Sequence, residues 1–163
     1  MVRSEALRGQ LARMLAWNEA HVGFDAAVEG LPAALRGRRP ENFPHSCWEL
    51  VEHIRLAQRD LLEFCRNPTY SAPRWPDDYW PAQPAPPSPR SWDESIAAFR
   101  TDREALQAFV RESGTDLGAR IPHGTGQTYL RSVLLAADHT SYHVGQLVAV
   151  RHLLGAWPPA PAE

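Results

Sequence analysis

The sequence predicts an all-α fold, a four-helix bundle formed by a single domain over residues 1–163. In four separate stretches, apolar residues recur at spacings of three and four, which is the period of a helix with one buried face. Alternating patterns typical of strands are nearly absent. The chain has 163 residues, of which 44% are hydrophobic and 22% are charged, as is typical of one globular domain with a sizeable core.

The first predicted helix covers residues 4–29. Leu7, Leu11 and Leu15 follow the helical period, and the pattern continues beyond them to the end of this range. Gly30 marks the end of the helix, since glycine is common just after a helix C-terminus.

The second predicted helix covers residues 46–66. Ser46 and Glu49 form a capping-box pattern, in which the serine hydroxyl and the glutamate three residues later bond the unpaired backbone amides at the helix start. Ile54 belongs to the apolar face that follows, and the helix is expected to end before Pro68.

A loop is predicted over residues 67–90, which contain eight of the 15 prolines. This proline density excludes a helix or a central strand. Trp75, Tyr79 and Trp80 favour a loop that packs on the body of the protein, and a flexible linker between two domains is the alternative. At ~3 Å per residue, a crossover loop of this length can pass along the whole bundle, which allows the helices on either side of it to run parallel.

Two more helices are predicted after this crossover loop. One covers residues 91–113 and begins with a second capping-box pattern, formed by Ser91 and Glu94. The last covers residues 128–154 and is followed by a tail, residues 159–163, that we expect to be frayed.

Charge and composition exclude several classes of protein. The 17 basic residues are all arginines, and with 19 acidic residues the net charge is −2, so we expect no binding of nucleic acid or of an anionic membrane by bulk electrostatics. Without lysine, a Schiff-base enzyme and a P-loop are excluded. No apolar run reaches the ~18 residues of a membrane-spanning helix. The first ten residues contain no apolar signal segment, so we expect a cytoplasmic protein.

Three of the seven histidines form a candidate metal site. His139 and His143 are four residues apart, so both rings lie on one helix face, and that face carries apolar residues such as Leu147. His53 lies on the apolar face of the second helix. Buried imidazoles need partners for both nitrogens, and one divalent cation can be a partner for all three rings. The pattern predicts a Zn²⁺-type site with one or more open positions, and core histidines without a metal are the alternative.

Other kinds of metal centre lack the residues that they need. Thr140 follows His139, so the glutamate that acts as general base in H-E-x-x-H proteases is missing. The Glu-x-x-His pairs of di-iron bundles are missing as well. One metal ion is therefore expected, with its bound water or thiol as the nucleophile and no protein side chain identified as catalytic.

Four more residues are candidates for the pocket or for contacts that support the ligands. His21 could line the pocket, with a partly exposed structural histidine as the alternative. Glu49 could support a ligand unless the capping box holds it, and Tyr142 could offer its hydroxyl to a substrate unless it only packs. Gln146 could hydrogen-bond a ligand. His45 is expected in a loop before the second helix.

The residues around these histidines resemble the DinB-like superfamily. Residues 44–54 are similar to its second helix, and residues 138–147, which contain the string H-x-x-x-H-x-G-Q, are similar to its fourth. The resemblance covers nearly the whole chain and implies up-down-down-up connectivity. It also implies one divalent metal ion, commonly zinc or nickel, held at the positions of His53, His139 and His143.

The resemblance further implies a partner and an activity. Many members are homodimers, and some relatives are metal-dependent transferases or isomerases that use a low-molecular-weight thiol such as mycothiol or bacillithiol. One hypothesis is therefore a metal-dependent thiol S-transferase or hydrolase that acts on a small-molecule substrate. The alternative is a non-catalytic, stress-related bundle whose metal is structural or sensory and is closed by a fourth protein ligand, such as His21 or Glu49.

Overall fold

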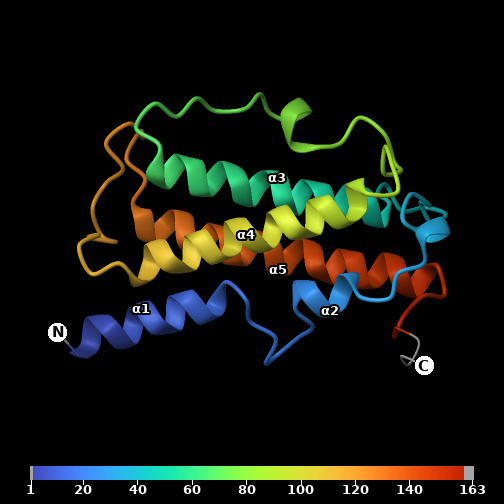
Figure 1. Cartoon of the computed structure of the whole chain (residues 1–163), viewed down its shortest axis with the longest axis horizontal. Helices are drawn as coiled ribbons and strands as arrows, with labels where there is room; N and C mark the ends of the chain where they lie inside the picture. Colours follow the sequence, from blue (N-terminus) through green and yellow to red (C-terminus); the bar gives the residue numbers. More distant parts are fainter. Residues whose placement is uncertain (1, 160–163) are drawn as a thin grey trace.

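The computed structural model describes residues 2–159, and in this range it contains helices and no β-strand (Figure 1). The all-α prediction is confirmed. None of the described helices combines the length and the apolarity that crossing a lipid bilayer requires. Residues 160–163 of the predicted frayed tail lie outside the described residues. In the described range, five α-helices and two short 3-10 helices follow one another: α1 (Val2–Met14), α2 (Phe24–Val28), η1 (Ala33–Leu35), α3 (Cys47–Arg66), η2 (Asp77–Tyr79), α4 (Ser91–Arg111) and α5 (Tyr129–Leu153).

The prediction of one continuous helix over residues 4–29 is wrong. The chain leaves α1 after Met14 and forms α2 only after a break. Residues 16–21 are exposed, so this stretch has no buried apolar face to stabilise a helix. Asn18 and Gly23 also have low helix propensity, and a glycine costs about 1 kcal/mol relative to alanine inside a helix.

The capping boxes differ in outcome. At the start of α3, Ser46 Oγ accepts a hydrogen bond from the Glu49 amide at 3.1 Å, and Glu49 Oε2 accepts one from the Ser46 amide at 2.8 Å, as predicted. The second predicted box is wrong, because Ser91 is the first residue of α4 and Arg90 is the cap. The Ser91 amide instead donates to Ser88 Oγ at 3.3 Å, so a serine two residues before the cap bonds this free amide.

Helices α3 and α4 run in the same direction, as the pairing of their side chains shows. Ser95 donates a hydrogen bond to Glu52 at 2.7 Å, and seven residues further along both helices Arg59 pairs with Asp102 at 2.9 Å. Figure 1 shows α5 running in the opposite direction beside them. Since α3 and α4 start at the same end, residues 67–90 have to return along the whole length of α3, and they do so as the green segment in Figure 1.

The crossover loop, residues 67–90, contacts the rest of the protein at Pro84 and Ala85, near the C-terminal end of the loop. Ser46 Oγ donates a hydrogen bond to the Pro84 carbonyl at 2.5 Å. Gly37 lies so close to the loop that a Cβ atom placed on it would be 2.6 Å from Ala85 Cα. Glycine is therefore needed at residue 37, because no larger side chain fits between the two backbones.

Gly37→Ala is expected to lower the free energy of unfolding by about 1–3 kcal/mol, because the added methyl group overpacks this contact. Gly114→Ala is the matched control, since nothing lies within 4 Å of a Cβ atom at that residue. Its stability is expected to stay the same or to rise by up to about 1 kcal/mol, through a less flexible unfolded chain. Urea unfolding followed by circular dichroism checks both variants, and equal midpoints would contradict the close contact.

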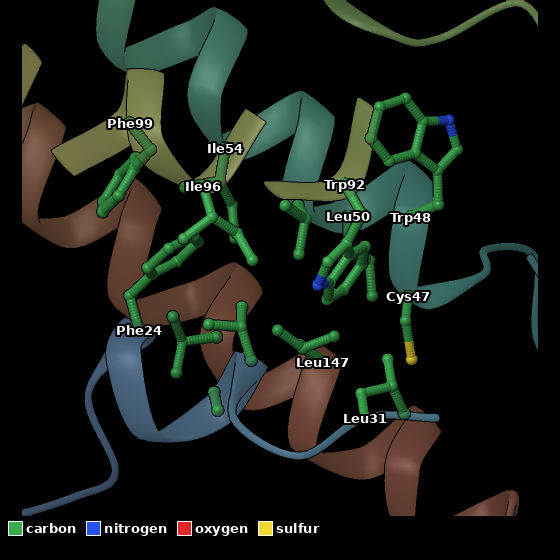
Figure 2. Packing of buried hydrophobic residues seen from close by; sticks show 14 of the residues in the cluster. Phe24, Leu31, Cys47, Trp48, Leu50, Ile54, Trp92, Ile96, Phe99 and Leu147 are labelled. Carbon is green, nitrogen blue, oxygen red and sulfur yellow. The ribbon is translucent and has the colours of Figure 1, made fainter. Parts of the chain in front are cut away.

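The apolar core consists of two clusters. In the first, side chains of α2, α3, α4 and α5 meet, and Figure 2 shows Phe24 and Leu147 among them. The second cluster joins α1 to the C-terminal parts of α3 and α4 and to the N-terminal part of α5. Along α5, the second cluster ends at Ala137 and the first begins at Val144. The interval between them is where a polar site can lie inside the protein without breaking up either cluster.

Candidate metal centre

His53 of α3 meets His139 and His143 of α5 between the two apolar clusters. One ring nitrogen from each histidine lies within 4.8 Å of the others, and the Nε2 atoms of His53 and His139 are 3.1 Å apart. The three pairs of ring centroids are separated by 4.8, 4.6 and 4.5 Å. Among residues 2–159, no other histidine, cysteine or carboxylate joins this group. The structure therefore brings together the three residues that the sequence singles out as ligands.

Helix geometry explains why the three rings converge. His139 and His143 are one turn apart, so both point from α5 toward α3, against which it packs. His53 is 2% exposed and His143 is 8% exposed, whereas His139 is half-buried. The group is thus covered on most sides and is most accessible near His139.

The crossover loop holds His53 in one tautomer. Its Nδ1 lies 2.7 Å from the Tyr79 carbonyl oxygen, which can only accept a hydrogen bond. The Nδ1 proton is therefore donated to this carbonyl, and Nε2 of the neutral ring has an unshared electron pair on the side of His139. Histidine ligands of metal ions commonly show this arrangement, in which the nitrogen that does not bind the metal donates to an oxygen.

His143 has the same kind of support from its own helix. Its Nδ1 donates to Gln146 Oε1 at 2.7 Å, which leaves Nε2 without a proton. The Gln146 amide nitrogen in turn donates to the Tyr142 hydroxyl at 3.2 Å, which fixes the orientation of the amide. Gln146 therefore lies where the sequence suggests, in contact with one of the three candidate ligands, His143. Tyr142 is 63% exposed, and its ring is edge-on to His143 at 4.8 Å.

Burial keeps the three rings neutral near pH 7. It lowers the pKa of His53 to about 4, although the hydrogen bond to the Tyr79 carbonyl opposes this shift. It also lowers the pKa of His139 to about 4, and the neighbouring rings of His143 and His53 add to the effect. Burial lowers the pKa of His143 as well, against the opposing hydrogen bond with Gln146. The neutral ring is the form in which histidine binds a metal ion.

The nitrogen atoms of this group fit a divalent transition-metal ion. The Nε2 atoms of His53 and His139 are 3.1 Å apart and share one hydrogen bond, which His139 donates because the His53 proton is on Nδ1. A divalent cation between the rings would take the place of that proton. Imidazole suits zinc, nickel and related ions, and three protein ligands leave at least one coordination position for water or a substrate. His53, His139 and His143 are thus the residues that could hold such an ion.

Two further aromatic residues border the group, and sequence reasoning does not place either of them there. The Trp80 indole lies flat on His53, with ring centroids 3.9 Å apart and planes at 3°. The His45 ring also stacks on the Trp80 indole, and the two ring centroids are 4.2 Å apart. His45 lies in the loop before α3, as expected, and it also forms a stack of three rings with Trp80 and His53. The tryptophans of the crossover loop indicate that the loop packs on the body of the protein, but nothing in the sequence indicates that one of them contacts the three histidines.

His21 and Glu49 lie outside the group formed by His53, His139 and His143. His21 is exposed in the break between α1 and α2, where its Nδ1 is 3.0 Å from the Val22 carbonyl oxygen. Glu49 accepts hydrogen bonds from the Ser46 amide and from Arg39 Nε, both at 2.8 Å. Its carboxylate therefore serves the helix cap and an ion pair, and neither residue is in place as a fourth ligand.

Comparison with known proteins identifies the family of this chain. A family model described as the DinB superfamily matches residues 16–147, which is more than half of the chain and includes all three histidines. Neither the curated proteins nor the solved structures contain a match. On the strength of the family match, this chain belongs to the DinB superfamily.

Proposed function

We propose that this protein is a metal-dependent enzyme with one divalent ion, zinc or nickel, bound by His53, His139 and His143. The observation that carries the proposal is the convergence of one nitrogen from each ring within 4.8 Å of the others. When bound, the ion would supply Lewis acidity, which lowers the pKa of a coordinated water or thiol. We further propose that the nucleophile is a low-molecular-weight thiol of the mycothiol or bacillithiol type. The enzyme would either transfer this thiol to an electrophilic small molecule or use it to isomerise such a molecule.

The number of protein ligands supports an enzyme. Structural zinc sites are closed by a fourth protein ligand, whereas catalytic sites keep a position open. His21 and Glu49 are engaged elsewhere, and no further histidine, cysteine or carboxylate of residues 2–159 joins the group. An ion held by these three rings would therefore be able to exchange a ligand.

The residues around the rings support the same proposal. The Tyr79 carbonyl and the Gln146 amide oxygen hold the protons of His53 and His143 on Nδ1, so that each Nε2 atom keeps the unshared electron pair that a metal ion binds. The Tyr142 hydroxyl is an exposed polar group beside His143, in a place where it could hydrogen-bond a substrate.

The alternative is a non-catalytic, stress-related protein in which the ion only joins α3 to α5. One observation favours it: the stack of His45 and Trp80 covers His53 and so limits access to one side of the group. The alternative predicts a metal that binds tightly but does not exchange its remaining ligand for a thiol.

Metal content and thiol binding together test these proposals. Protein purified without added metal is expected to contain about one equivalent of zinc or nickel per chain. In Co²⁺-substituted protein, added mycothiol or bacillithiol is expected to change the visible spectrum, because a thiol that enters the open position alters the coordination of the ion. An unchanged spectrum, together with no turnover across a panel of electrophiles, would favour the non-catalytic alternative. Protein that binds no divalent ion would contradict both.

A further inference from the structure

The crossover loop contacts the metal centre through two adjacent residues, Tyr79 and Trp80. The Tyr79 carbonyl accepts a hydrogen bond from His53 Nδ1 at 2.7 Å, and the Trp80 indole stacks on the same ring. A carbonyl in a loop can orient a ring only if the loop itself is held in place. The contacts that hold Tyr79 therefore bear directly on the state of His53.

Asp60 holds Tyr79 from the same helix that carries His53. Its Oδ2 accepts a hydrogen bond from the Tyr79 hydroxyl at 2.8 Å, and its Oδ1 accepts one from the Tyr70 hydroxyl at 2.6 Å. Asp60 follows His53 by seven residues, which corresponds to two turns, or about 10.5 Å along α3. Tyr79 thus spans two turns of α3, with its hydroxyl bound at one end and its carbonyl at the other.

Both tyrosine hydroxyls remain hydrogen-bond donors at neutral pH. Burial, together with the carboxylate of Asp60, raises the pKa of Tyr79 above its usual value. The pKa of Tyr70 is raised for the same reasons. A hydrogen bond from a protonated hydroxyl to a carboxylate is stronger than one between neutral groups. Asp60 is therefore a firm anchor for the crossover loop.

We propose that Asp60 is a positioning residue of the metal centre, which holds Tyr79 so that its carbonyl keeps the His53 proton on Nδ1 and leaves Nε2 free for the ion. This inference rests on the proposed function. Only one nitrogen of a neutral imidazole carries the proton, so a displaced carbonyl would allow the proton to move to Nε2, where it blocks coordination. Contacts of this kind change metal affinity by roughly 10–100-fold.

Three variants of the full-length protein separate this role from a general effect on the loop. Tyr79→Phe removes the hydroxyl and keeps the ring and the carbonyl, and Asp60→Ala removes the acceptor of both hydroxyls. Tyr70→Phe is the matched control, because it removes the other hydroxyl bound to Asp60 and leaves the Tyr79 anchor intact. By competition with a chromophoric chelator, the Kd for Zn²⁺ is expected to rise by about 10-fold or more in Tyr79→Phe and Asp60→Ala. In Tyr70→Phe it is expected to stay within about twofold of the wild type.

The tautomer of His53 in the metal-free protein is a second readout, which a loss of overall stability alone would not change. ¹⁵N NMR of the ring is expected to show the Nδ1–H form in the wild type and in Tyr70→Phe. A mixture with the Nε2–H form is expected in Tyr79→Phe and in Asp60→Ala, and Tyr79→Phe alone suffices if Asp60→Ala does not fold.

The outcomes of the two measurements are distinct. Wild-type Zn²⁺ affinity in Tyr79→Phe, an unchanged tautomer in that variant, or an equal loss of affinity in Tyr70→Phe would each overturn the role of Asp60. If the wild-type protein itself binds no Zn²⁺, the proposed function fails. The NMR comparison then still decides whether Asp60 and Tyr79 set the tautomer of His53.

Discussion

His143→Ala is expected to lower the affinity for Zn²⁺ by more than about 100-fold, so that the metal is lost during purification. The substitution removes one of three nitrogen donors, and removing a direct ligand costs more than the 10–100-fold that is typical of losing a contact behind a ligand. The two remaining histidines, His53 and His139, would have to bind the ion alone. The Zn²⁺ affinity of metal-free protein, measured by competition with a chelator, and the metal content after purification check this prediction.

His152→Ala is the matched control for this variant. His152 lies on the same helix, nine residues after His143, and it is exposed. Its replacement is expected to leave both the affinity and the metal content unchanged. Circular dichroism of the metal-free proteins shows whether each variant is folded. A folded His143→Ala protein that retains one equivalent of metal would contradict the proposed ligand set.

Arg151→Met is expected to lower the free energy of unfolding by about 2–4 kcal/mol. Arg151 is 0% exposed, and its guanidinium donates to the carbonyl oxygens of Ala27 at 2.6 Å, Glu29 at 2.8 Å and Ala156 at 3.0 Å. The carbonyls of Ala27 and Glu29 lie at the C-terminal end of α2, where no further helical turn offers them an amide, and Ala156 follows the end of α5. Methionine fills similar space without a donor, so the three carbonyls would lose this partner and α2 would be held to α5 by apolar packing alone.

Two other arginine substitutions make this prediction specific. Arg131→Met removes an exposed arginine of the same helix, and its effect is expected to stay within about 0.5 kcal/mol. Arg151→Lys keeps the positive charge but has no planar group that can reach three carbonyls, so an intermediate loss is expected. Urea unfolding at a fixed metal content provides the comparison. Wild-type stability in Arg151→Met would show that these hydrogen bonds only replace equally good ones to water.

Local signals were sufficient to predict the helices that carry the three histidines. The capping box of Ser46 and Glu49 starts α3 as predicted, because all of its contacts lie within one turn. The spacing of His139 and His143 places both rings on one face of α5 in any fold that keeps this helix. The apolar residues beside these rings then show that the face is buried. For this reason, the three residues that meet in the structure could be selected before their distances were known.

Local sequence signals gave wrong predictions for the first helix and for the start of α4, where these signals are weak. The apolar period of residues 4–29 continues through the break after α1, yet Trp17 is 46% exposed and buries too little surface to sustain a helix there. Ser91 has the sequence of a cap, but the turn before it supplies Ser88 in its place. In both cases the local pattern represents a preference of only about 1 kcal/mol, which is too small to decide the structure of the segment by itself.

Helical periodicity was enough to predict the all-α class, the helices α3 and α5, and the identity of the three histidines, because it converts the order of residues directly into a shared face. The groups that lie against those rings could be identified only from the folded arrangement of the chain. Every residue has a carbonyl, and an aromatic residue in a loop follows no period, so nothing in the sequence distinguishes the carbonyl of Tyr79 or the indole of Trp80 from others. Their contacts with His53 depend on the path by which residues 67–90 return along α3, and that path is set by anchors far apart in the chain, such as Asp60 and Ser46.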